Sequence, residues 1–223
     1  MTDFLEKYRK VRDEKKSVLC IGLDPSPTDV REEEVLHYCL ELVEKTSDYA
    51  AAFKPNSQFV LFNLRMRELC ELTREIRSHG CISILDHKLS DIGSSNDAAI
   101  QQIRASGFDA FTASPFPGNI KETSDLAHRE KLGAIILGLM SNSQAAWVQK
   151  DATFEGKPLY QKIAEEVRTS DADGLVMGTT GHVTADDIRT ARVLAGSNAL
   201  FLCPGTGAQG GEIQKAMDNT GPN

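Results

Sequence analysis

The sequence predicts an α/β fold, the closed (β/α)8 or TIM barrel, and three patterns carry this prediction. Short apolar runs alternate with longer amphipathic stretches, which indicates a parallel sheet with helical crossovers. Most repeats take roughly 25–35 residues, about the size of one βα unit. Nearly every apolar run ends in charged, polar, Gly or Pro residues. The strand-like runs are Val18–Leu23, Tyr49–Phe53, Cys81–Leu85, Asp109–Ala113, Gly133–Leu139, Gly174–Met177 and Ala199–Leu202. Helical periodicity is expected over Glu32–Lys45, Asn63–Ser78 and Leu159–Arg168.

The positions of the polar residues separate the barrel from its alternative, the doubly wound open sheet. A barrel gathers all its strand ends around one mouth, so functional residues follow many strands. An open sheet concentrates them at its switch point. Here they follow nearly every run, which favours the barrel. They are Asp24-Pro25, Lys54-Pro55-Asn56, Asp86-His87-Lys88, Ser114-Pro115, Ser141-Asn142, Gly178-Thr179-Thr180 and Pro204-Gly205.

The strand count is one short of a complete barrel. Seven runs are present, and Gly210–Asn223, which follow the loop of the seventh, hold no eighth. We therefore expect residues 1–223 to form a single barrel domain that lacks its last strand because the native polypeptide continues beyond Asn223.

Composition and charge narrow the class of protein. Apolar residues make up 40% and charged residues 26%, as in a soluble globular domain. The net charge of −7 disfavours a nucleic-acid surface. No apolar run approaches the roughly 20 residues that span a bilayer, and Met1–Lys7 lack a secretory signal, so a cytoplasmic location is expected. The five cysteines include no C-x-x-C pair, which argues against a disulfide framework and a zinc site.

The most informative residues are charged and lie at predicted strand ends. Residues two apart on a strand share a face, so Asp86 and Lys88 are expected to project together into the barrel mouth. Asp24 ends the first strand and Lys54 the second, while Asp91 lies past the end of the third. A salt-bridge ring without a function is the alternative. Apart from Asp91, all of these residues are expected at strand ends, on the face that carries catalysis in this fold, and this location favours an active site.

The charge state of Lys88 decides which chemistry is open to it. A Schiff-base lysine must be neutral, whereas flanking carboxylates hold the ammonium protonated. Lys88 is therefore expected to donate a proton rather than to act as a nucleophile. Asp86 would repel a substrate carboxylate brought into the same pocket. Such a site is suited to expelling carbon dioxide and protonating the carbanion that remains.

A glycine-rich segment, Gly205–Gly210, fits the letters G-x-G-x-x-G. The dinucleotide-binding fingerprint belongs at the first strand of a βαβ unit, whereas this segment follows the last visible strand. In barrels the loops after strands seven and eight commonly hold phosphate, and Gln209 adds a side-chain donor. A flexible turn is the alternative. Ser141, after the fifth strand, is a candidate for binding an amide-like group, or else plain turn chemistry.

Taken together, these residues make the sequence resemble the orotidine 5′-monophosphate decarboxylases along its whole length. The family signature D-x-K-x-x-D-I matches Asp86, Lys88, Asp91 and Ile92, and the closing P-G-x-G-A-Q-G-G matches residues 204–211. The first-strand Asp and second-strand Lys of the family match Asp24 and Lys54. The amino-acid sequence of Ser114–Asn119 is most similar to that of two-domain UMP synthases in which the decarboxylase precedes an orotate phosphoribosyltransferase. The resemblance therefore implies a fused phosphoribosyltransferase domain.

The resemblance implies an enzyme that decarboxylates orotidine 5′-monophosphate to UMP, the last step of de novo pyrimidine biosynthesis, without a metal or cofactor. Lys88 would protonate C6 and Asp86 would face the departing carboxylate. The other implied roles are ribose binding by Asp24 and Lys54, a pyrimidine contact by Ser141, and substrate binding by Pro204, Gln209 and Gly210, with Gln209 bridging base and phosphate. The implied active unit is a homodimer in which Asp91, accompanied by Ser95, reaches the neighbouring site.

One family feature and two alternatives complete the expectations. Family members carry a phosphate-binding Arg after strand eight, so we expect weak or no activity from residues 1–223 alone. A sugar-phosphate decarboxylase or aldolase of the same superfamily, commonly Mg²⁺-dependent, is the nearest rival. A non-catalytic nucleotide-binding fragment is the rival from another class.

Overall fold

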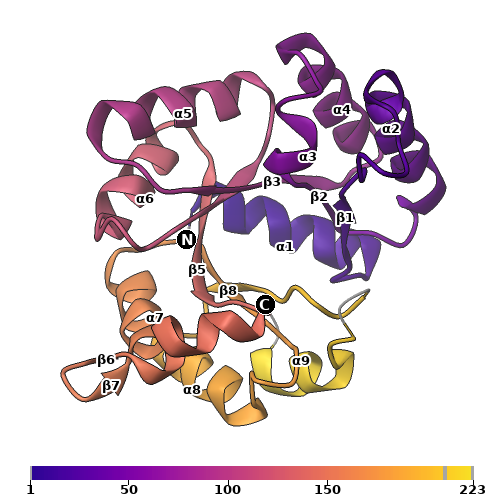
Figure 1. Ribbon diagram of the computed structural model, residues 1–223. Coiled ribbons are helices and arrows are strands. Elements are labelled where there is room, and N and C mark those ends of the chain that lie inside the picture. The colour runs from indigo at the N-terminus through magenta and orange to yellow at the C-terminus, as the bar shows by residue number, and fades with distance from the viewer. Residues whose placement is uncertain (1, 208–209, 222–223) are drawn as a thin grey trace. The chain divides into compact units, whose positions relative to one another are not determined.

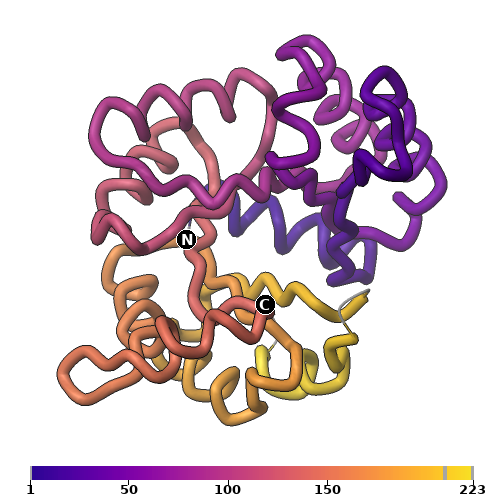
Figure 2. The backbone as a smooth tube through the Cα atoms, in the orientation of Figure 1, coloured from indigo at the N-terminus to yellow at the C-terminus, as the bar shows by residue number. Residues whose placement is uncertain are grey.

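The computed structural model describes residues 2–207 and 210–221 (Figure 1). The chain divides into two compact units, one formed by Met1–Thr112 with Leu126–Gly133 and the other by Ala113–Asp125 with Ala134–Asn223. Figure 2 follows the backbone from the indigo N-terminal part to the yellow C-terminal part.

The first unit alternates helices with parallel strands. Strands β1, β2, β3 and β4 are neighbours in that order. The register pairs Cys20 with Ala52 and Leu23 with Pro55, and then Ala52 with Ile82. Helices α2 and α4 lie side by side next to these strands (Figure 1). The elements are α1 (Asp3–Lys15), β1 (Cys20–Leu23), η1 (Glu32–Glu34), α2 (Val35–Thr46), β2 (Ala52–Pro55), α3 (Ser57–Val60), α4 (Met66–Ser78), β3 (Ile82–Leu89), α5 (Gly93–Ala105) and β4 (Ala110–Ala113).

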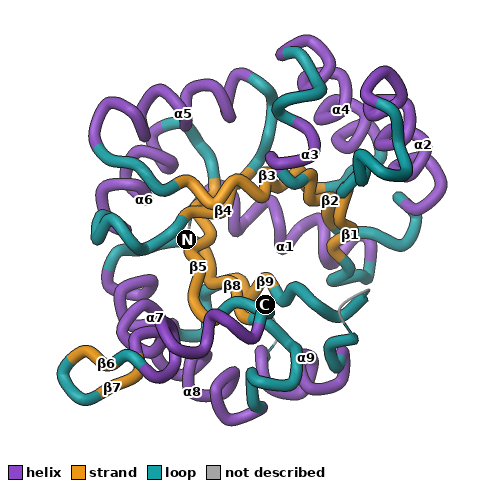
Figure 3. Tube along the Cα trace, viewed as in Figure 1, coloured by secondary structure: helices purple, strands orange, loops and turns teal. Residues whose placement is uncertain are grey.

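The second unit continues the same alternation. Strands β5, β8 and β9 are parallel neighbours, and α8 packs against both α7 and α9. The antiparallel pair β6–β7 forms a hairpin at the tip of a loop (Figure 3). The end of α6 and the first residue of β5 belong to the first unit. The elements are α6 (Ile120–Arg129), β5 (Gly133–Leu139), η2 (Ser143–Ala145), η3 (Trp147–Asp151), β6 (Thr153–Phe154), β7 (Lys157–Pro158), α7 (Leu159–Thr169), β8 (Gly174–Met177), α8 (Ala185–Ala195), β9 (Leu200–Leu202) and α9 (Ile213–Thr220).

Helix α1 shows how local sequence and packing combine in the first unit. The side chain of Thr2 caps the helix by accepting a hydrogen bond from Leu5 N at 3.3 Å. Phe4, Leu5, Tyr8 and Val11 are buried, which is the spacing of one helix face. A Cβ at Gly133 would collide with the Phe4 ring, so the glycine admits the helix at this position. Packing of an apolar face, rather than helix propensity, therefore fixes α1.

The predicted strands are present among the described residues, but two of them extend further than predicted. Strands β5 and β8 have the predicted bounds, whereas β2 continues through Pro55 and β3 through Leu89. Lys54 and Asp86–Lys88 thus lie within strands, not after them. The apolar pattern ends at the first charge, but backbone pairing continues, as the parallel bridge between Asn56 and Asp86 shows. The apolar runs therefore began too early for β1 and β2, where Val18, Leu19 and Tyr49 are exposed, and stopped short of the polar ends of β2 and β3.

The first residues of two helices, and the presence of the β6–β7 hairpin, also differ from the prediction. Helix α2 begins at Val35 because Glu32–Glu34 form a 3₁₀ turn, and α4 begins at Met66. The β6–β7 hairpin was not predicted. No helix in the described part of the chain is both long and apolar enough to cross a membrane. The single-domain organisation stays a prediction.

Candidate active site

Asp86, on β3, is the centre of the charged cluster in the first unit. Its Oδ2 accepts a hydrogen bond from Lys54 Nζ of β2 at 2.9 Å, and its Oδ1 accepts one from Lys88 Nζ at 2.8 Å. The side chains of Lys54 and Asp86 are each 14% exposed, while that of Lys88 is 37% exposed. One carboxylate therefore lies between two ammoniums, and the more accessible ammonium is Lys88.

Thr112, on β4, completes this centre, and the sequence analysis missed it. Its Oγ1 donates to Asp86 Oδ1 at 2.9 Å and accepts from Lys88 N at 2.9 Å. The side chain is 1% exposed. The sequence signal was a threonine among the apolar residues of Ala110–Ala113, and this signal does not say which partner the hydroxyl meets. Thr112 fixes both the carboxylate of Asp86 and the backbone of Lys88.

The backbone at Lys88 has a left-handed conformation with a φ of 54°. Non-glycine residues adopt it at a cost of about 1–2 kcal/mol, and such strain concentrates at functional sites. Asp86 and Lys88 do come together as predicted. Both residues lie within β3, although Lys88 departs from the extended backbone of a regular strand.

The charges of the cluster hold each other in the ionised form. Burial lowers the pKa of Lys54, but the charge and hydrogen bond of Asp86 outweigh burial and raise this pKa above its ordinary value. Burial raises the pKa of Asp86, yet Lys54 and Lys88 together bring it below its ordinary value. At neutral pH, Asp86 is therefore an anion and Lys54 is a cation.

Asp24 is near the cluster but more exposed. Loss of hydration raises its pKa above the ordinary value against the opposing effect of Lys54, and Asp86 raises it further. Its carboxylate bends back over β1, so a Cβ at Gly22 would lie 3.1 Å from Asp24 Oδ2. Burial among these groups also raises the pKa of the Cys20 thiol to about 11. The four charged residues predicted at strand ends thus gather in one place, by direct contact for three and by electrostatic proximity for Asp24.

Asp91 lies on the short segment between β3 and α5, and Ser95 lies in the first turn of α5. Both are exposed, and Asp91 Oδ1 accepts a hydrogen bond from Ile92 N at 2.8 Å. Asp91 lies past the end of β3, as predicted from the sequence.

The remaining predicted site residues belong to the second unit, and Gln209 is outside the described residues. Thr179 Oγ1 donates to Pro204 O at 3.2 Å, and Gly211 N donates to Gly205 O at 2.6 Å. A Cβ at Gly211 would collide with Thr179 Oγ1 and Gly205 O, so this position of the loop requires glycine. Gly210 is exposed and has a φ of 70°.

Ser141 follows β5 and is held by the loop that follows β8. Thr180 Oγ1 donates to Ser141 O at 2.5 Å, and a Cβ at Gly178 would lie 2.7 Å from Ser141 Cα. Met140 N donates to Gln149 Oε1 at 2.8 Å. Sequence reasoning proposed Ser141 but found none of the residues that position it.

The arrangement has the features of an enzyme built on an α/β barrel scaffold, with a charged centre at the carboxyl ends of its strands. A model of the family described as "Orotidine 5'-phosphate decarboxylase / HUMPS family" matches residues 17–222. The orotidine 5′-phosphate decarboxylase of Janthinobacterium sp. (strain Marseille) is 33% identical over 96% of this chain and 82% of that protein. The chain belongs to the orotidine 5′-phosphate decarboxylase / HUMPS family.

Solved structures show the same fold. The UMP synthase of Leishmania donovani matches 98% of this chain with a TM-score of 0.84 and 28% identity. The chain spans about half, 48%, of the length of that protein. The OMP decarboxylase of the same organism matches 95% of this chain and 83% of its own, with a TM-score of 0.80 and 26% identity. The predicted α/β barrel class is therefore confirmed.

Proposed function

We propose that this chain converts orotidine 5′-monophosphate to UMP and carbon dioxide, a decarboxylation in pyrimidine biosynthesis. The observation that carries the proposal is the carboxylate of Asp86 lying between the ammoniums of Lys54 and Lys88 at 2.9 and 2.8 Å. Membership of the family supports the same substrate, because relatives bearing the decarboxylase name align over nearly the whole chain.

In the proposed reaction, the bond from C6 of the pyrimidine to its carboxylate breaks and carbon dioxide leaves. The electron pair of that bond stays on C6. Lys88 donates a proton to C6, becomes a neutral amine, and regains a proton from water. Asp86 contributes in two ways: its negative charge disfavours the substrate carboxylate more than the neutral product, and its hydrogen bond orients the Lys88 ammonium.

The neighbouring groups order this centre and bind the rest of the nucleotide. Lys54 compensates the charge of Asp86, and Lys54 and Asp24 bind ribose hydroxyls. Ser141 contacts the pyrimidine edge, and the loop containing Pro204, Gln209 and Gly210 binds phosphate. Binding energy from the remote phosphate raises the rate when it is used to close and order the site.

The proposed assembly is a homodimer in which Asp91 and Ser95 contribute to the neighbouring site. The exposure of Asp91 before α5 and of Ser95 in its first turn, together with the 63% exposure of Ile92, supports this proposal. The similarity to one half of a UMP synthase chain also supports a fused phosphoribosyltransferase domain in the whole protein. The cytoplasmic location and the independence from metals stay predictions.

The direct test follows the loss of orotate absorbance when the protein meets orotidine monophosphate. Lys88→Ala should lower turnover by about 10³-fold or more, because it removes the proton donor. Lys45→Ala is the control, since Lys45 is a surface lysine of α2 paired with Glu41 in the same unit. A Lys88→Ala variant as fast as the control would remove Lys88 from the mechanism.

Two further measurements test the cofactor and the assembly. Turnover should survive exhaustive chelation, whereas loss of activity restored by Mg²⁺ would favour the sugar-phosphate rival.

Mixing inactive Lys88→Ala and Asp91→Ala chains should restore about a quarter of wild-type activity, because a mixed dimer holds one intact site. No recovery after subunit exchange would contradict a shared site.

A further inference from the structure

The segment that joins β5 to α7, residues 140–158, is held by a small number of polar contacts. Its residues 142–144, 147 and 151–157 are exposed, and Trp147 is 70% exposed. The two adjacent residues Gln149 and Lys150, in η3, point toward the body of the unit. Gln149 Oε1 accepts a hydrogen bond from Met140 N, directly before Ser141. The position of Ser141 therefore depends, through this hydrogen bond, on the position of η3.

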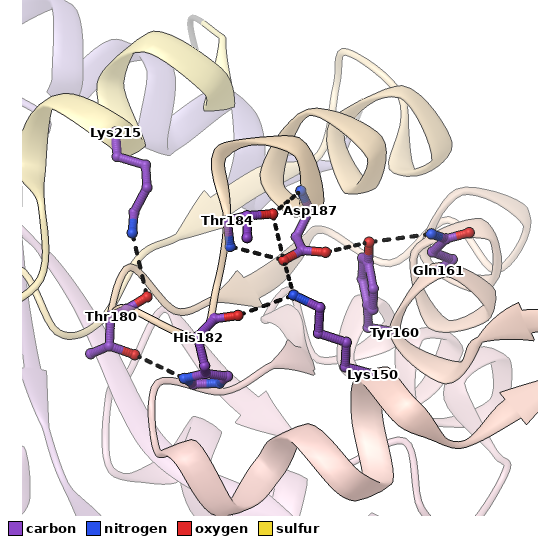
Figure 4. Close-up of polar contacts among 8 residues, drawn as sticks. All are labelled: Lys150, Tyr160, Gln161, Thr180, His182, Thr184, Asp187 and Lys215. Carbon is purple, nitrogen blue, oxygen red and sulfur yellow. Dashed lines mark hydrogen bonds and ion pairs between the residues drawn. The ribbon is translucent and has the colours of Figure 1, made fainter.

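Lys150 fastens η3 to the start of α8 (Figure 4). Its Nζ donates to Asp187 Oδ2 at 2.6 Å and to His182 O at 3.1 Å. The side chains of Lys150 and Asp187 are 29% and 10% exposed. A pair this little exposed is screened less by solvent than a surface pair, and removal of one partner leaves a costly charge.

Asp187 is a fixed counter-charge for Lys150. It is the third residue of α8 and forms a capping box with Thr184, whose N and Oγ1 both donate to Asp187 Oδ2 at 2.8 Å. Tyr160 OH donates to Asp187 Oδ1 at 3.0 Å. These contacts, with that of Lys150, bring the pKa of Asp187 below its ordinary value although burial alone would raise it.

The same residues connect Lys150 to Ser141 on a second route. Since Thr180 Oγ1 gives its proton to Ser141 O, His182 Nδ1–H donates to Thr180 Oγ1 at 3.3 Å. Lys150 in turn holds the backbone carbonyl of His182. Lys215 Nζ donates to Thr180 O at 3.3 Å, which steadies the loop after β8 (Figure 4). Both routes from Lys150 therefore end at the backbone of residues 140–141.

We propose that Lys150 is a positioning residue for the reaction: its ion pair with Asp187 fastens the β5–α7 segment so that Ser141 is preorganised for the pyrimidine. The inference rests on the proposed function, in which Ser141 contacts the substrate. Preorganisation matters because small misplacements of a binding group lower the rate even when the chemistry lies elsewhere.

The experiment compares Lys150→Met with Lys157→Met by measuring kcat and KM for orotidine monophosphate. Lys157 is a matched control because it lies in the same segment and pairs with Glu165 at 2.7 Å, but is 53% exposed. Lys150→Met should lower kcat/KM about 10-fold, chiefly through KM, and Lys157→Met should stay within about 2-fold. Lys150→Arg should restore most of the loss.

A double-mutant cycle separates positioning from general stability. In a Ser141→Ala background, Lys150→Met should change kcat/KM by less than about 2-fold, because the group it positions is gone. Thr180→Val, which removes the hydrogen bond to Ser141 O, should reproduce the KM effect without touching Lys150, and covers the case in which Lys150→Met does not fold.

The outcomes distinguish this proposal from the function on which it rests. If Lys150→Met lowers the melting temperature while its KM and kcat equal those of Lys157→Met, the positioning role is wrong and decarboxylation stands. The positioning role would also be wrong if Lys150→Met lowered kcat/KM equally in the wild-type and the Ser141→Ala backgrounds. A wild-type chain that leaves orotidine monophosphate unchanged would overturn the proposed function, and the positioning role with it.

Discussion

Asp86 in the first unit and Asp187 in the second are both little-exposed carboxylates that bind lysine at short distance, and the two centres differ in what else they bind. Asp86 accepts from two ammoniums and one hydroxyl, all from side chains at strand ends. Asp187 accepts from one ammonium, one backbone amide and two hydroxyls, and it caps a helix. Both aspartates have a pKa below the ordinary value.

The difference lies in the lysines more than in the aspartates. Lys88 is 37% exposed and has a left-handed backbone, whereas Lys150 is 29% exposed and also holds a backbone carbonyl. Lys88 therefore combines accessibility with local strain, as expected for a group that meets a substrate. The Lys150 pair is built into the scaffold. A short Lys–Asp distance alone does not identify a catalytic pair, because the Lys150–Asp187 and Lys88–Asp86 distances are similar, at 2.6 and 2.8 Å.

Asparagine substitution at the two aspartates should separate the centres most clearly. Asp86→Asn is expected to lower kcat by about 10³-fold, because it removes the charge that opposes the substrate carboxylate and that pairs with the Lys88 ammonium. Asp187→Asn should lower kcat/KM by about 10-fold or less, in line with a positioning role. Steady-state kinetics on both variants tests this, and similar losses at the two sites would break the comparison.

Thr112→Val should sharpen the comparison within the first centre. It removes the hydroxyl that joins Asp86 to the backbone of Lys88, and we expect kcat/KM to fall about 30-fold, as for a buried hydrogen bond to a charged group. Thr73→Val is the control, because Thr73 is also 1% exposed and donates to Ser106 O at 2.7 Å away from the charged cluster. The control should lose stability and keep kcat; equal kinetics for the two variants would contradict the role of Thr112.

The pH dependence of stability should reveal the scaffold role of Asp187. Its folded-state pKa is lowered, so its contribution is fully present above the ordinary carboxyl pKa of about 4 and is lost as pH falls through the lower folded-state value. We expect the free energy of unfolding of wild type to exceed that of Asp187→Asn by about 2 kcal/mol at neutral pH. This difference should shrink below about pH 4. Urea unfolding at several pH values measures it. A gap that stays constant into acid would exclude the ion pair as its source.

Much of the fold was predictable because it depends on local patterns. The bounds of β5 and β8 were predicted from their apolar runs, since strands buried on both faces are continuously hydrophobic. The ends of β2 and β3 were not, because charged residues there keep the backbone pairing of a strand while losing its apolar signature. The family motif located Asp86 and Lys88, while Thr112, Gln149 and Lys150 carried no motif.

By itself the sequence determined the α/β class, the family and the charged residues at strand ends, because each of these is written in short-range patterns. Tertiary structure alone decided that Thr112 joins Asp86 to Lys88, and that Lys150 meets Asp187. Such partners are brought together by strand register and helix packing, and a shift of one residue would turn a strand side chain to the opposite face. The identity of a charged residue is local, whereas the partner that sets its chemistry depends on the whole fold.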